Sequence, residues 1–95
     1  MKSLPARIAL ATTEAGGRQG PINLRSGYQP HLRVRDGDLL GVEFHLGVER
    51  WLNPGESADV ELKLLYDVDY SALEPGVSFA ILEGPVHEVG NGTIL

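Results

Sequence analysis

The alternation of apolar and charged residues in short segments is the feature that most constrains the fold of this chain. Over residues 40–46 every second residue is apolar, and residues 60–66 repeat the pattern with Glu61 and Lys63 between the apolar positions. Because successive side chains of a strand point to opposite faces, this period of two predicts strands with one face in a core and the other in solvent. Spacing typical of an amphipathic helix is scarce. The sequence therefore predicts an all-β protein.

Six extended segments are predicted, and turn residues separate them. Asp36-Gly37-Asp38 is expected to close a hairpin with a positive φ at Gly37, and Pro54-Gly55 to form a turn with a positive φ at Gly55. Gly90 and Gly92 favour a bend or a close approach of two backbones. Six short strands in about a hundred residues are typical of a sandwich or a small barrel, and barrel closure removes exposed strand edges. The segments are residues 6–12, 31–35, 40–46, 60–66, 77–81 and 86–95.

Two irregular segments interrupt this pattern. Residues 13–29 contain a glycine-rich loop that is too long for a hairpin and too poor in periodicity for a helix. Residues 68–76 form a connector in which Tyr70 and Leu73 are expected to anchor the chain to the core. No linker or internal repeat divides the sequence, so a single domain over residues 1–95 is predicted.

The composition limits the classes of protein to which the chain can belong. With 95 residues, 42% of them apolar, one compact core is expected, and the lack of cysteine excludes disulfides and thiolate metal sites. No run approaches the roughly 20 apolar residues of a membrane span, and the first residues lack the apolar region of a signal peptide. We therefore expect a soluble, cytoplasmic protein that does not insert into a membrane.

The charge of the chain is unevenly distributed. Eight Lys and Arg residues against thirteen Asp and Glu residues give a formal net charge of −5, which opposes non-specific attraction to nucleic acid or anionic lipid. The second half is mostly acidic, whereas cationic residues cluster in the first half, at Arg18, Arg25, Arg33 and Arg35. Binding to RNA would therefore be local to those residues.

Four motifs occur in order along the chain: "EAGGRQGPI", "SGYQPHLRVR", "LNPGESADVELKLLYDV" and "GVSFAILEG" followed by "VGNGTIL". Together they resemble the C-terminal β-barrel, the third domain, of translation elongation factor Tu. The resemblance extends from about residue 6 to residue 95. It implies a six-stranded antiparallel closed β-barrel, here as a single-domain relative of that factor.

The resemblance also implies a surface that approaches transfer RNA. The matching positions in this chain are Arg18, Gln19, His31, Glu83 and Gly84. Gln19 and His31 stand where the family usually has His and Gln. In two further places the chain departs from the family: Tyr66-Asp67 replaces a basic residue or His followed by Pro, and Leu82 replaces an Arg. Since phosphate contacts dominate affinity for nucleic acid, these losses predict weakened RNA binding.

No catalytic or cofactor site is predicted. A nucleotide-binding P-loop needs a lysine after its glycine-rich turn, and neither Lys2 nor Lys63 follows such a turn. There is no Gly-x-Ser-x-Gly elbow and no cysteine nucleophile. His31, His45 and His87 lie on separate segments without metal-ligand spacing. We expect neither an enzyme nor a metal protein.

Several residues nevertheless fit either a binding or a structural role. Arg18 could bind a phosphate or a partner beside Gly16 and Gly17, or the loop could simply turn a corner of the barrel. Arg33 and Arg35, with His31 and Arg18, could form a basic patch or a solvated strand face. Trp51 could be an exposed anchor for a partner or could cap the barrel mouth.

These patterns predict a non-enzymatic binding module that docks a protein partner. The alternative is a translation-associated factor that binds transfer RNA or similar RNA through Arg18, His31, Arg33 and Arg35. A homodimer through Trp51 or Leu65 would cover apolar surface that a solitary barrel leaves exposed.

Overall fold

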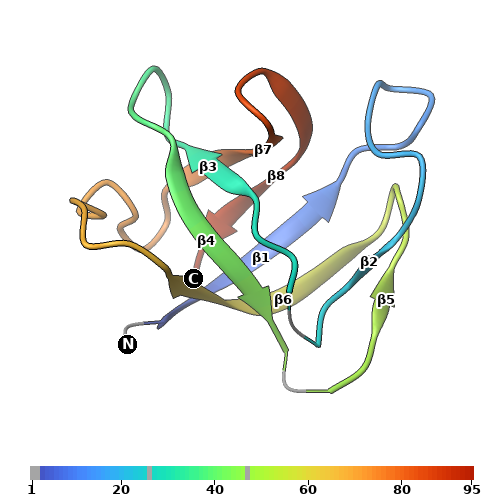
Figure 1. Cartoon of the computed structure of the whole chain (residues 1–95), viewed down its shortest axis with the longest axis horizontal. Helices are drawn as coiled ribbons and strands as arrows, with labels where there is room; N and C mark the ends of the chain where they lie inside the picture. The colour runs from blue at the N-terminus through green and yellow to red at the C-terminus, as the bar shows by residue number, and fades with distance from the viewer. Residues whose placement is uncertain (1–2, 26, 47) are drawn as a thin grey trace.

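The computed structural model describes residues 3–25, 27–46 and 48–95. Six strands form a closed barrel in the order β1-β6-β4-β3-β7-β8, and every neighbouring pair is antiparallel (Figure 1). Two further strands, β2 and β5, pair with each other. Within the described ranges no helix could cross a membrane. The predicted all-β, six-stranded antiparallel barrel is confirmed. The strands are β1 Ser3–Leu10, β2 Ile22–Asn23, β3 His31–Arg33, β4 Leu40–His45, β5 Trp51–Leu52, β6 Ser57–Leu64, β7 Ser78–Glu83 and β8 His87–Ile94.

The core lies inside the barrel and follows the predicted alternation. In the register of β4 and β6, Val42 lies opposite Leu64 and Phe44 opposite Leu62, and these inward side chains meet those of the other strands. Phe44 and Leu62 have no exposed surface. The polar residues between them, Glu43 and Lys63, pair on the outer face. The period of two in these segments thus correctly predicts which side chains lie in the core.

The strand boundaries differ from the prediction at both ends of β6. The strand begins at Ser57 and ends at Leu64, so Tyr66, predicted to face the core, is instead 60% exposed. The chain leaves the barrel after Leu65, and the Tyr66 ring lies on the backbone of Gly41, where a Cβ atom would come within 2.3 Å of Cε2. Tyr70 and Leu73 anchor the connector as predicted: Leu73 is buried, and the Tyr70 hydroxyl donates to the Gly41 carbonyl at 2.7 Å.

The β2–β5 ribbon was not predicted. β2 lies in the predicted loop 13–29, and β5 immediately precedes the Pro54-Gly55 turn (Figure 1). Ile22 pairs with Leu52, and both side chains are buried against the barrel core. Strands of two residues carry no periodicity, so only tertiary packing reveals them.

Of the two predicted turns, one is confirmed and the other corrected. Gly55 has φ 90°, and the Glu56 amide donates to the Asn53 carbonyl at 3.0 Å, as expected for a Pro-Gly turn. In the β3–β4 hairpin the positive φ, 55°, lies at Arg35 rather than at Gly37. The Gly37 amide donates to the Val34 carbonyl at 3.0 Å, so the turn closes one position earlier than predicted.

The predicted close approach at Gly90 and Gly92 is confirmed where β8 pairs with β1. A Cβ atom at Gly90 would lie 2.3 Å from the carbonyl oxygen of Ala9. At Gly92 it would lie 2.6 Å from the Arg7 carbonyl oxygen and 2.6 Å from Cζ of Phe79. The barrel therefore closes along β1 only because these two positions lack side chains.

We predict that Gly90→Ala destabilises the barrel, because the added methyl group meets backbone that cannot move without breaking the β1–β8 ladder. Overpacking of this kind typically costs about 1–3 kcal/mol, which in a domain of this size lowers Tm by roughly 4–8 °C per kcal/mol. Thermal unfolding followed by circular dichroism measures the change. The matched control is Gly20→Ala, since a Cβ atom at Gly20 meets nothing within 4 Å. Equal Tm values for the two variants would contradict the close-packing explanation.

Candidate functional site

The glycine-rich loop after β1 is folded on itself by backbone hydrogen bonds. The Gly16 amide donates to the Thr13 carbonyl at 3.1 Å, and the Gly17 amide donates to the Thr12 carbonyl at 3.0 Å. Gly17 is buried against the backbone that follows β1, and a Cβ atom there would lie 2.5 Å from the Ala11 carbonyl oxygen. Because the amides of Gly16 and Gly17 already have partners, they do not form a cradle for phosphate.

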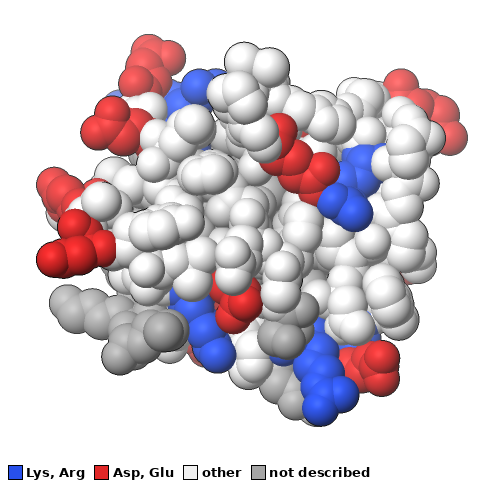
Figure 2. Space-filling view, in the orientation of Figure 1, with Lys and Arg blue, Asp and Glu red and all other residues white. Residues whose placement is uncertain are grey.

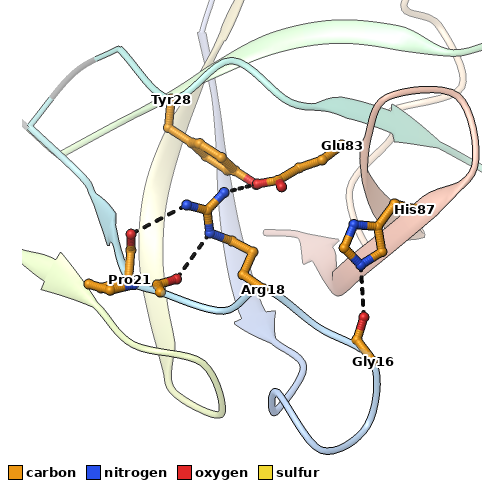
Figure 3. A network of polar contacts seen from close by, with 7 residues as sticks. Gly16, Arg18, Pro21, Tyr28, Glu83 and His87 are labelled. Carbon is orange, nitrogen blue, oxygen red and sulfur yellow. Dashed lines mark hydrogen bonds and ion pairs between the residues drawn. The ribbon is translucent and has the colours of Figure 1, made fainter.

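Arg18 is held by acceptors of the protein itself (Figure 3). Nε donates to the Gly20 carbonyl at 3.1 Å, Nη2 donates to the Pro21 carbonyl at 3.4 Å, and Nη1 forms an ion pair with Oε2 of Glu83. Both charged side chains are largely covered, with 25% and 30% of their surfaces exposed. The donor fork predicted to bind a phosphate or a partner is thus directed inward.

Tyr28 joins this ion pair to the core. Its hydroxyl donates to Oε2 of Glu83 at 2.5 Å, and its ring lies 5.2 Å from the Arg18 guanidinium carbon, within range of a cation–π contact. The ring also meets Phe44 edge-on, with the centroids 5.5 Å apart. Burial, and next the contact with the Glu83 carboxylate, raise the pKa of Tyr28 well above its ordinary value. Tyr28 therefore stays protonated and holds Glu83 against Arg18.

A shallow hollow lies beside this network, and it contains three of the predicted site residues. Arg18, Gln19 and Glu83 line it together with glycines of the loop and His87. Nε2 of His87 lies 2.8 Å from the Gly16 carbonyl oxygen, which connects the β7–β8 hairpin to the loop (Figure 3). Gly84 follows Glu83 in that hairpin turn with φ 70°.

The other predicted basic residues lie elsewhere. Arg33 and Arg35 line a separate hollow beside Glu88 and Asn91 that shares no residue with the Arg18 hollow. His31 lies at the start of β3, paired with Gly41 and Leu82. The structure therefore does not bring all four predicted basic residues into one patch.

Trp51 projects from the β2–β5 ribbon. Its side chain is 56% exposed, whereas the next residue, Leu52, is completely buried. Within β5, Leu52 rather than Trp51 contacts the barrel core.

A further concave surface was not predicted. It is lined by apolar side chains of β1, β6 and the connector together with two carboxylates, and we refer to it as the connector hollow. Its residues are Leu4, Leu64, Tyr66, Asp67, Val68, Asp69, Tyr70, Ser71 and Leu73. The sequence pattern placed Tyr66 in the core, which concealed this surface. In the sequence, this surface was indicated only by the apolar residues within the acidic connector.

Within the described ranges, no three His, Asp or Glu side chains lie close enough together to hold a metal ion. Two of the carboxylates are engaged in ion pairs within the protein. Glu83 binds Arg18 and Tyr28, and Asp59 forms a salt bridge with Arg7 across β1 and β6 at 2.8 Å.

The closed six-stranded barrel and its ordered motifs resemble a barrel domain of the translation elongation factors. The chain is similar to elongation factor Tu 2 of Streptomyces avermitilis, with 37% identity over 89 residues. These residues make up 94% of this chain and 21% of that protein, so the chain spans about a fifth of the relative's length. No family model matches the chain. The resemblance to elongation factor Tu inferred from the motifs is confirmed.

We predict that Tyr28 makes stability depend on pH in the alkaline range. The folded state raises the pKa of Tyr28 above the unfolded value of about 10, so it binds this proton more tightly than the unfolded state does. The resulting stabilisation is fully present below about pH 10 and is lost as the pH rises above it. Urea unfolding of wild type and Tyr28→Phe at several values between pH 8 and 11 measures the effect. The wild type should lose more stability over this range, and parallel curves would contradict the role of Tyr28.

Proposed function

We propose that this barrel is a non-enzymatic, cytoplasmic module of the translation apparatus that docks a protein partner. The observation that carries the proposal is the internal engagement of Arg18. Its charge is offset by Glu83, and its Nε and Nη2 donate to the carbonyls of Gly20 and Pro21. The loop that the resemblance assigns to transfer RNA therefore offers little positive charge to a phosphate backbone.

The distribution of the other charges supports the same proposal. On the face shown in Figure 2, the cationic side chains lie in separate places and not in one continuous patch. Arg7, like Arg18, is paired with a carboxylate. A dispersed set of cations on a chain of net charge −5 gives weak attraction to RNA, whereas uncharged surface is compatible with a protein interface.

The proposal gives Trp51 the role of an anchor in the docked complex. Large aromatic side chains dominate many interfaces, and loss of such an anchor costs about 2 kcal/mol or more, roughly thirtyfold in Kd. We expect the immobilised barrel to capture a protein from a bacterial translation extract. Calorimetry with that protein, once purified, should show the thirtyfold loss for Trp51→Ser.

Val86→Ser is the matched control for this experiment. Val86 is 84% exposed and lies in the β7–β8 turn, away from the ribbon that carries Trp51. Binding should be unchanged in this variant. Equal affinity of wild type and Trp51→Ser would remove Trp51 from the interface, and capture of RNA alone would contradict protein docking. Concentration-dependent sedimentation would reveal a homodimer instead.

Arg33 and Arg35 favour RNA binding as a second candidate function. They line one hollow, and neither forms an ion pair with another residue of the described ranges. If this candidate is correct, transfer RNA should bind with an affinity that falls steeply as salt increases.

Replacing both Arg33 and Arg35 with Ala should reduce the slope of log Kobs against log salt by roughly 2, since each lost phosphate contact removes about one unit. Gel-shift titrations at several salt concentrations measure this slope. Arg25→Met is the control, because Arg25 is exposed, does not line this hollow, and its loss should leave the slope unchanged. An unaltered slope in the Arg33→Ala/Arg35→Ala variant would eliminate this surface as the RNA site.

A further inference from the structure

The connector between β6 and β7 is fixed to the barrel by hydrogen bonds. Besides donating to Gly41, the Tyr70 hydroxyl accepts from the Tyr66 amide at 3.1 Å. The amide of the buried Leu73 donates to the Tyr70 carbonyl at 3.0 Å, and the Gly76 amide donates to the Ile94 carbonyl at 2.7 Å. Because these contacts hold the connector in place, the connector hollow is formed before any ligand arrives, which lowers the entropic cost of binding.

Part of the lining of the connector hollow is apolar. Leu64 and Leu73 are continuous with the barrel core, while Tyr66 and Val68 remain 60% and 55% exposed at its surface. Its volume of about 540 Å³ is in the range of pockets that bind small ligands and single anchoring side chains. Exposed aromatic and aliphatic surface around a concave site favours insertion of a bulky apolar side chain.

The rim of the connector hollow is negatively charged. Asp67 and Asp69 line it, and Asp38 lies beside Asp69 in an adjoining hollow. Oδ1 of Asp69 accepts from the Ser71 amide at 2.9 Å, and this contact with Ser71 lowers the pKa of Asp69, so the carboxylate is ionised at neutral pH. Acidic side chains gather at the left edge of Figure 2, where Figure 1 shows the connector. Among the described residues that line the hollow, none is cationic.

From this combination we propose that the connector hollow binds a peptide segment with a bulky apolar residue flanked by lysine or arginine, supplied by the docked protein partner. The apolar side chain occupies the space between Tyr66 and Leu73, and the flanking cations face Asp67 and Asp69. The inference rests on the proposed docking function and names the chemistry of the partner. A second copy of this chain is a poor occupant in a symmetric dimer, since two-fold pairing of this surface would bring like charges together.

The experiment is an NMR titration of the folded, ¹⁵N-labelled barrel with three hexapeptides. The first has a Phe-Leu pair with two lysines on each side, the second has glutamates in place of the lysines, and the third has a Ser-Ser pair between lysines. We expect the first peptide to shift amide resonances of Val68 to Leu73 and of Leu4 and to bind at least tenfold more tightly than either control. Binding should weaken as salt rises, since the flanking cations pair with exposed carboxylates.

Two sets of variants separate the apolar and charged contributions. Asp67→Asn combined with Asp69→Asn should weaken the first peptide about threefold to tenfold, since exposed ion pairs are individually weak. Asn at position 69 can still accept from the Ser71 amide, so the connector keeps its shape. Val68→Ser and Tyr66→Ser should each weaken binding about tenfold, whereas Val86→Ser should have no effect. Circular dichroism confirms that each variant is folded.

The outcomes distinguish this inference from the proposed function. Equal binding of the lysine and glutamate peptides, shifts confined to residues outside the hollow, or no binding at millimolar peptide would each overturn the connector site. Capture of a protein partner through Trp51 in the absence of peptide binding would overturn only this inference. Peptide binding without capture of any protein would overturn the docking function while leaving the hollow a peptide site.

Discussion

Closure of the barrel along β1 is the constraint on which the rest of the structure depends. β1 pairs with β6 on one side and with β8 on the other, and the second pairing requires Gly90 and Gly92 to meet the backbone of β1. With both edges of β1 satisfied, the six strands have no open edge in the main sheet, and their inward side chains share one core. The glycine-rich loop, the ribbon and the connector are segments attached to this closed frame.

The closed barrel brings residues that are distant in sequence within hydrogen-bonding range. Glu83 lies at the end of β7, Tyr28 packs on Phe44 of β4, and Arg18 reaches both from the loop, 65 residues before Glu83 in the chain. The network ties the loop to the barrel at a part-buried position where an unpaired charge would be costly. Arg18 is consequently a structural residue of the loop in this chain. The same arrangement offsets the charge of the loop's cation, and the proposed docking function rests on this pairing.

Particular residues show why some of this structure was predictable and some was not. The alternation in residues 40–46 and 60–64 predicted strands correctly because each strand is long enough to show a period and has one face in the core. The ribbon was missed because two residues, such as Ile22 and Asn23, show no period. Tyr66 was misplaced because the alternation continues past the point where the connector leaves the barrel. Arg18 and Glu83 were both predicted as site residues, but their ion pair depends on the path of the loop, which no local pattern encodes.

The Arg18 hollow and the connector hollow differ in what remains available to a ligand. In the Arg18 hollow the charges neutralise each other, and the loop amides of Gly16 and Gly17 are already bonded, so a ligand must displace existing contacts. In the connector hollow, by contrast, the Asp67 and Asp69 carboxylates face solvent and the apolar side chains of Tyr66 and Val68 are uncovered. In the proposed complex a partner gains both apolar burial and charge pairing at this surface. This chain corresponds to a fifth of its longer relative. The face that we propose for binding is distinct from the Arg18 loop, which the resemblance to elongation factor Tu assigns to transfer RNA.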